Sequence, residues 1–570
     1  MPSSRTGRGP QRTVNGRAEV PPEGAVGSDQ AHTQVVRKAG VVSLAVALSR
    51  VTGLVREVAF AGLFGAGMVY DAFVASYRIP NLLRDLLAEG ALSAAFVTTY
   101  SQALAEEGRE RAQQVSNRLT TLLVPFVVVL CVAGILLAEP LVRRIFPGYA
   151  EIEGKLELTV LLTRIMAPFL LFIVLAAKAM GVLNSHGKFG IPALSSTFFN
   201  LTSVGAGLLF GFVAGPPLGI APITGMALGT LLGGIVQYVC QIPSLRNTGL
   251  RYRPEVAPRD PRVLQILRLM GPAAIGGAAV QVNVMVNSVF ASRISDAAGQ
   301  IIDGPVSWLG YAFRFMQLPL GLFGVAVASA TLPVISRDAG AGRVDEFRET
   351  LARSLGLVFL LTIPSSVGLF VLSQPMVGVV YERGRFLPHD TEQTALALAF
   401  YCIGLVGYAS TKVLAPAFYA LNSVRIPMGV SVSSIAINFA LNHVLIDRLG
   451  LGHWALALST SVVATLNFVL LAGFMRSKIG GIQGRRLAYA ALRICVASAA
   501  MGVCCWACAG AVEGWIGEGT FLGRAAALLV SVPLGAGLVY ALCTAMRLPE
   551  LALAQRAFLA RTAGPTRHTR

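Results

Sequence analysis

The sequence at positions 119–138 is LTTLLVPFVVVLCVAGILLA, twenty consecutive residues without a charged side chain. An α-helix of about twenty apolar residues crosses the roughly 30 Å hydrocarbon core of a bilayer. Backbone polar groups in lipid must be satisfied within the segment, and this stretch lacks the alternation of barrel strands. The stretch therefore predicts a transmembrane helix.

Similar apolar stretches recur from Ala39 onward and predict an all-α integral membrane protein with about fourteen transmembrane helices. The composition agrees, because 54% of the 570 residues are apolar and only 13% are charged, against about 25% in soluble proteins. Eight cysteines in this length exclude a disulfide scaffold. We place the spans near residues 39–65, 73–103, 119–138, 159–183, 190–213, 218–243, 266–292, 305–335, 350–372, 393–420, 426–446, 453–475, 486–512 and 523–546.

The chain carries 47 Lys and Arg against 29 Asp and Glu, a formal net charge of +18. Most of the excess lies in a Gly-, Pro- and Arg-rich segment at 1–38, a linker at 246–265, a tail at 547–570 and alternate loops. We expect 1–38 to be a disordered basic tail. By the positive-inside rule, both termini and the linker are cytoplasmic. This distribution fits membrane topology better than nucleic-acid binding.

A weak internal repeat divides the spans into two halves. Tyr77-Arg78 is matched 236 residues later by Phe313-Arg314, and further weak matches lie near the same offset. Duplication predicts an N-lobe of six helices at 39–245 and a C-lobe of six at 266–475, related by an axis along the membrane normal. Two extra helices then occupy 476–546.

Several charged residues fall inside the predicted spans, where each costs at least ~2.5–3.5 kcal/mol and indicates a functional site. They may be listed by charge: the cations are Arg50, Arg56, Arg84, Arg314 and Lys412, and the carboxylates are Asp71, Asp85 and Glu89. On an ideal helix Asp71, Arg78, Asp85 and Glu89 share a stripe, although Pro80 disturbs that register. Pairing of Arg56 with Glu57, or snorkelling to an interface, is the alternative. A cavity lined by arginines suits an anionic substrate, especially a phosphate.

Several motifs closely resemble those of the MurJ (MviN) family, bacterial lipid II flippases of the MOP exporter superfamily. The matching stretches are SRVTGLVRE at 49–57, FGAG at 64–67, DAF at 71–73, RIPNLLR at 78–84, AEGA at 88–91, VSW at 306–308 and KVLAP at 412–416. The resemblance covers about residues 38 to 546.

The resemblance implies a V of two six-helix lobes around a central cationic cavity, and a groove for the undecaprenyl tail formed by the last two helices. It implies that lipid II passes from the cytoplasmic to the outer leaflet of the bacterial cytoplasmic (inner) membrane by alternating access. The implied headgroup ligands are Arg50, Arg56, Arg84, Arg314 and Lys412, with Asp71, Asp85 and Glu89 as cavity or gating carboxylates. We expect a monomer that contacts membrane lipids, needs no cofactor, and is driven by the membrane potential or an ion gradient.

Three positions depart from the best-known family members. Asp85 stands where they carry a second basic residue, and Phe313 and Gln317 stand where they carry acids. We hypothesise that these changes redistribute charge between the lobes and keep the net charge of the cavity. Some members bind sodium near the seventh span, but that span has no carboxylate here, so no metal site is predicted.

Two other classes of function remain open on the sequence alone. One is a flippase for another polyprenyl-diphosphate-linked glycan of the O-antigen type, or less favourably a drug or cation antiporter. The other is an integral-membrane enzyme acting on polyprenyl phosphate, which would need an acid/base or metal cluster in a loop. We favour a transporter, because no such cluster is visible and the closely spaced Cys504, Cys505 and Cys508 lie within an apolar span.

Overall fold

The computed structural model describes residues 25–552 and 555, without the side chains of 25–43, 88–91, 93–94 and 271–278. The described chain is helical throughout its length, and its β-structure is limited to an isolated bridge between Ser295 and Ile301. This agrees with the all-α class expected from the apolar stretches.

The first half of the chain forms the six predicted spans of the N-lobe, several of them built from two helical pieces. The pieces are α1 (Ala25–Phe64); α2 (Met68–Arg84), π-helix η1 (Asp85–Leu92) and α3 (Ser93–Glu106); α4 (Gly108–Leu136); α5 (Ala138–Ile145) and η2 (Pro147–Ala150); α6 (Lys155–Met166) and α7 (Phe169–Ser185); α8 (Gly190–Leu208) and η3 (Leu209–Val213); and η4 (Pro216–Leu218), α9 (Pro222–Val239) and α10 (Ile242–Arg246).

The second half repeats this pattern and adds the two extra helices. Its pieces are α11 (Pro261–Ala291); α12 (Pro305–Pro319), π-helix η5 (Leu320–Gly324) and α13 (Val325–Gly340); α14 (Val344–Val371) and α15 (Ser373–Tyr381); α16 (Pro388–Ile403) and α17 (Leu405–Ala420); α18 (Arg425–Asn442) and η6 (His443–Arg448); α19 (Trp454–Ile479); α20 (Gly484–Ile516); and α21 (Phe521–Ala545).

The helix lengths support the expected number of spans. Within the described residues, ten helical segments are long and apolar enough to cross a membrane, and α16 with α17, bent by 45°, makes an eleventh. The remaining predicted spans, 39–65, 73–103 and 266–292, coincide with α1, with α2 to α3, and with α11. The first two contain most of the intramembrane charges, which lowers their hydropathy.

One boundary of the predicted disordered tail is wrong. Helix α1 begins at Ala25, so residues 25–38 are helical, whereas residues 1–24 lie outside the described part. No proline occurs between Ala25 and the apolar span. A helix already formed in the span can therefore extend backwards, gaining one hydrogen bond for each residue fixed.

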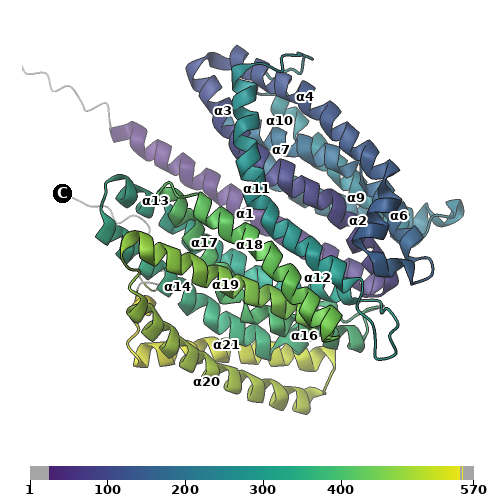
Figure 1. The fold of residues 1–570 in the computed structure, drawn as a ribbon, viewed down its shortest axis with the longest axis vertical. Coiled ribbons are helices and arrows are strands. Elements are labelled where there is room, and N and C mark those ends of the chain that lie inside the picture. Colours follow the sequence, from purple (N-terminus) through teal and green to yellow (C-terminus); the bar gives the residue numbers. More distant parts are fainter. Residues whose placement is uncertain (1–24, 553–554, 556–570) are drawn as a thin grey trace, which may run out of the picture.

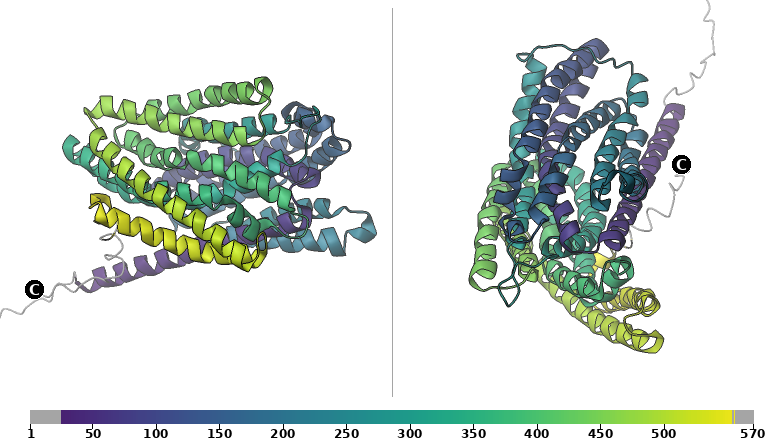
Figure 2. Two further views of the ribbon diagram at one scale, coloured as in Figure 1. Left: turned by 90° about the horizontal axis from the view of Figure 1, so that it is seen from below. Right: turned by 90° about the vertical axis from the view of Figure 1, so that its right-hand side faces the viewer.

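The two lobes converge near α2 and α12 and diverge toward the ends of α3 and α13 (Figure 1). Helices α20 and α21 pack on α14 and α15, on the side of the C-lobe away from the N-lobe (Figure 2). Helix α11, assigned by sequence to the C-lobe, packs on α18 but also on η1 and α3 of the N-lobe. It therefore joins the two halves.

Two faces of the helix bundle are named here by their connecting segments. The linker face carries residues 247–260, between α10 and α11, and the gate face carries residues 292–304, between α11 and α12. The largest buried apolar cluster contains residues of both lobes near the gate face, among them Phe60, Tyr70, Tyr311 and Phe386. Packing thus holds the lobes together at the gate face.

Candidate functional site

A group of three charged residues lies between α1 and α12, inside the predicted spans. Glu57 Oε1 lies 3.1 Å from a guanidinium nitrogen of Arg56 and 3.2 Å from one of Arg314. The Glu57 side chain is 13% exposed and that of Arg314 is 49% exposed. One buried carboxylate therefore holds two arginines from opposite lobes, and one of them keeps half of its surface accessible.

Arg50 approaches the C-lobe from the same helix as Arg56. A Cβ placed on Gly321 of η5 would lie 3.1 Å from a guanidinium nitrogen of Arg50, so the absence of a side chain there leaves room for the arginine. The structure thus places Arg50, Arg56 and Arg314, three of the five predicted cations, along the α1–α12 side between the lobes.

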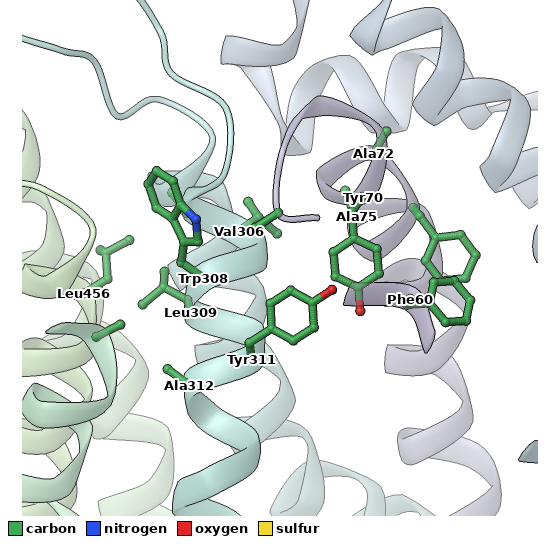
Figure 3. Packing of buried hydrophobic residues seen from close by; sticks show 14 of the residues in the cluster. Phe60, Tyr70, Ala72, Ala75, Val306, Trp308, Leu309, Tyr311, Ala312 and Leu456 are labelled. Atoms are coloured by element: carbon green, nitrogen blue, oxygen red, sulfur yellow. The ribbon is translucent and has the colours of Figure 1, made fainter. Parts of the chain in front are cut away.

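Aromatic packing fixes the Glu57 end of this group. The rings of Tyr70 and Tyr311 stack across the lobes with centroids 5.0 Å apart, and Phe60 packs beside Tyr70 (Figure 3). The Tyr70 hydroxyl donates to Glu57 Oε2 at 3.4 Å. The carboxylate is therefore positioned by a rigid apolar contact as well as by its two arginines.

Asp71 lies at the gate face and binds the C-lobe directly. Its Oδ1 accepts hydrogen bonds from the Ser307 backbone N–H at 2.9 Å and the Ser307 hydroxyl at 2.5 Å, and its Oδ2 accepts from the Gly304 N–H at 2.9 Å. These donors belong to the first turn of α12, whose N–H groups have no partners within the helix. An N-lobe carboxylate thus caps a C-lobe helix, where it also complements the helix dipole.

A buried lysine completes this contact. Lys155, at the start of α6, is fully buried, and its ammonium lies 3.1 Å from Asp71 and 2.6 Å from Asp303. It also lies 4.2 Å from the centre of the Tyr149 ring, which favours a cation. We call Asp71, Lys155, Asp303 and Ser307 the gate cluster.

The predicted stripe of Asp71, Arg78, Asp85 and Glu89 is not formed by the described side chains. Asp71 faces α12, whereas Arg78 donates to the Val284 carbonyl at 3.1 Å and to the Ser288 hydroxyl, both on α11. The π-helix η1 begins at Asp85 and shifts the register that an ideal α-helix would continue. The side chain of Glu89 lies outside the described residues.

The remaining predicted ligands lie apart from Glu57 in different elements. Arg84 forms an ion pair with its neighbour Asp85, with a nitrogen–oxygen distance of 2.9 Å. Lys412 is exposed on α17 and forms no hydrogen bond or ion pair with the described residues. In the seventh span, Asn287 accepts from Asn438 at 2.9 Å and from Asn442 at 2.8 Å.

The linker face contains an ion-pair network that ties α11 to the N-lobe. Asp260 caps α11 through the Arg262 N–H at 2.8 Å and binds Arg111 and Arg118 of α4. Burial raises the pKa of Asp260, but the hydrogen bonds from Arg118, Arg111 and the backbone outweigh it, so the pKa is lower than usual. The hydrogen bond from Arg262 likewise lowers the pKa of Glu107.

The sequence alone did not identify the gate cluster beyond Asp71, and considered Glu57 only as a partner of Arg56. Lys155 was assigned to a loop of mixed charge, because its neighbours Glu151, Glu153 and Glu157 hid its burial. One signal was available: α12 begins at Gly304-Pro305 without a local capping side chain. Its first turn therefore needed an acceptor from elsewhere.

Comparisons with known proteins agree with this architecture. The profile of the family described as "Lipid II flippase MurJ" matches residues 60–524. A protein of Bdellovibrio bacteriovorus named probable lipid II flippase MurJ is 33% identical over 480 residues, covering 84% of this chain and 89% of that protein. The lipid II flippase MurJ of Burkholderia cenocepacia is 35% identical over 428 residues, covering 74% and 80%.

The fold is similar to those of solved transporters. A structure of lipid II flippase MurJ in an inward closed conformation aligns with a TM-score of 0.72 and 24% identity, covering 89% of this chain and 99% of that one. An inward-facing MATE multidrug transporter of the MOP superfamily aligns with a TM-score of 0.64 and 14% identity, covering 76% and 96%. The chain therefore belongs to the MurJ family of lipid II flippases, multi-pass transporters of the bacterial cytoplasmic membrane rather than enzymes.

Proposed function

We propose that this chain moves lipid II from the cytoplasmic to the outer leaflet by alternating access of its two lobes. The names of its relatives supply the substrate, and the Arg56–Glu57–Arg314 group is the observation that carries the mechanism. A diphosphate is a strong acceptor for arginine, which binds it through paired hydrogen bonds. Arginines from both lobes can thus hold one headgroup.

The orientation follows from the distribution of charge. The linker face carries Arg246, Arg251, Arg253 and Arg259, so the positive-inside rule assigns it to the cytoplasm. The gate face, where the lobes are in contact, is then the outer face. In this orientation the headgroup enters from the cytoplasmic leaflet while the gate cluster is closed.

Glu57 would act as an internal competitor for the substrate. It neutralises part of the charge of Arg56 and Arg314 before the headgroup arrives, which keeps these arginines in place between the lobes. The diphosphate, with its greater charge, takes over contacts to Arg50, Arg56 and Arg314. Glu57 can then retrieve the arginines and help to release the product on the outer side.

The gate cluster would open as the lobes rock. Opening must break the contacts of Asp71 with the first turn of α12, while Lys155 can keep Asp303 or Asp71 as its partner. Arg84, Lys412 and the carboxylates Asp85 and Glu89 remain proposed cavity residues. Because the substrate is anionic, an inside-negative membrane potential favours its outward movement.

The test is complementation of a bacterium depleted of its own lipid II flippase. Arg314→Ala should abolish growth at unchanged protein level, because it removes the C-lobe cation from the site. Arg353→Ala is the matched control, since Arg353 forms an exposed ion pair with Glu349 elsewhere on the C-lobe. Normal growth with Arg314→Ala would refute the assignment. Failure of the correctly inserted parent chain would instead favour another polyprenyl-linked glycan as substrate.

A further inference from the structure

A cavity separate from the space between the lobes lies within the N-lobe near the linker face. Its volume is about 280 Å³, and its walls come from α4, α7, α9, α10 and the linker. The lining residues are Thr120, Val124, Leu175, Lys178, Ala179, Val182, Tyr238, Leu245, Leu250 and Tyr252. Ligand sites of proteins commonly have about 300–1,000 Å³, so the cavity fits a headgroup rather than a whole lipid.

Lys178 of α7 points its charge into this cavity without a protein partner. The residue is only 7% exposed, and within the described part of the chain it has no hydrogen bond or ion pair. An ammonium buried among apolar walls is unfavourable unless it is paired. Most intramembrane lysines snorkel to water, but burial shows that Lys178 does not.

The other polar groups of the cavity could serve the same ligand. Tyr238 is half-buried and its hydroxyl has no partner among the described residues, so it can donate to an anion. Tyr252 is 53% exposed, which places one side of the cavity at the protein surface. Lys178 and Tyr238 therefore offer donors to a ligand that enters beside Tyr252.

The position of the cavity matches the headgroup level of one leaflet. Lys178 lies seven residues before the end of α7 at Ser185, about 10 Å along the helix axis. Exposed Arg246 and Arg251 lie beside lining residues of α10 and the linker, and would attract anions. Basic pockets between transmembrane helices on the cytoplasmic side commonly bind anionic lipid headgroups.

We propose that this cavity binds the phosphate of an anionic phospholipid, with Lys178 as its counter-ion and Tyr238 as a second donor. The apolar wall formed by Val124, Leu175 and Val182 would accommodate the glycerol and the first carbons of the acyl chains. The proposal does not depend on the transport of lipid II, because none of these residues belongs to the site between the lobes.

The test uses the purified full-length protein in detergent and native mass spectrometry of bound dioleoyl phosphatidylglycerol, with dioleoyl phosphatidylcholine as the neutral-headgroup comparison. Lys178→Met keeps the length of the side chain and removes the charge, whereas Lys178→Arg keeps the charge. Lys478→Met is the matched control, because Lys478 is exposed at the end of α19 and far from the lining residues in sequence. Elution as a single species in size-exclusion chromatography establishes folding.

We expect Lys178→Met to weaken binding of phosphatidylglycerol about fivefold or more, as for loss of one lysine near an anionic lipid. Lys178→Arg and Lys478→Met should bind as the parent does, and phosphatidylcholine binding should not change. Equal binding of phosphatidylglycerol by the parent and by folded Lys178→Met would overturn the proposal. Displacement of the lipid by millimolar inorganic phosphate or glycerol 3-phosphate would overturn the lipid as source and assign a soluble phosphate.

Discussion

Replacing Asp71 by Asn should weaken the closed gate without changing the size of the side chain. The amide oxygen can keep the bonds from Ser307, but the amide NH₂ would face the Gly304 N–H and the Lys155 ammonium, which are both donors. Two hydrogen bonds to a charged oxygen are lost, each worth about 1.5–3 kcal/mol. Lys155 keeps Asp303 as a partner at 2.6 Å, so it is not left unpaired.

A loss of about 3 kcal/mol specific to the closed gate shifts the equilibrium about 100-fold toward the open gate. If the parent populates the open gate at about 0.1–1%, the variant should populate it at about 10–50%. Asp71 is solvated when the gate is open, so the open form gains no comparable penalty.

The assay is double electron–electron resonance between nitroxides on Glu151→Cys and Glu392→Cys. Both residues are exposed near the gate face, one in each lobe, and the accessible native cysteines are replaced first. Asp71→Asn should add a population at longer distance. Asp296→Asn is the control, because Asp296 binds only its own turn through Ala298 and Gln300. An unchanged distance distribution in folded Asp71→Asn protein would refute the role given to the gate cluster.

Three further predictions concern charge balance and pH. Asp85→Arg should abolish complementation by adding two positive charges, and the added changes Phe313→Glu and Gln317→Glu should restore it; full activity of Asp85→Arg alone would contradict the redistribution hypothesis. Asp260→Asn should lower stability by about 2–3 kcal/mol at pH 7, through loss of a buried ion pair and a helix cap. Because the pKa of Asp260 is lowered in the folded state, the gap in melting temperature to the parent should narrow as pH falls below the unfolded value of about 3.9; a gap independent of pH would contradict this origin. Burial lowers the pKa of His453 to about 4, so the unfolded chain binds the extra proton and stability should fall between about pH 6.5 and 4. His453→Gln should flatten that part of a melting-temperature profile, and an equally steep profile would show that His453 is not responsible.

The spans and their halves could be predicted from sequence because lipid imposes length and hydrophobicity locally. The membrane charges Arg50, Arg56 and Arg314 could be found for the same reason, since each is costly there. Their partners could not, because Glu57 joins residues of two lobes only after the lobes have packed. Contacts across 257 residues, such as that of Glu57 with Arg314, leave no mark on local pattern.

The gate cluster shows the same limit from another side. Asp71 could be singled out as an intramembrane carboxylate, but its partner is the backbone of α12, which carries no sequence signal. The predicted stripe on the second span failed because a π-helix begins at Asp85, and i to i+5 bonding is not encoded by hydrophobic periodicity. Lys178 was overlooked because a single lysine in an apolar stretch resembles an ordinary snorkelling residue.

The most direct test of the central claim measures lipid II on the outer leaflet of bacteria whose own flippase has been depleted. The cells express the parent chain, Arg314→Ala or the control Arg353→Ala at equal levels. The account predicts surface lipid II with the parent and with Arg353→Ala, and accumulation in the inner leaflet with Arg314→Ala. Parent-level surface lipid II in cells that express Arg314→Ala would contradict the assignment of the diphosphate to the arginines between the lobes.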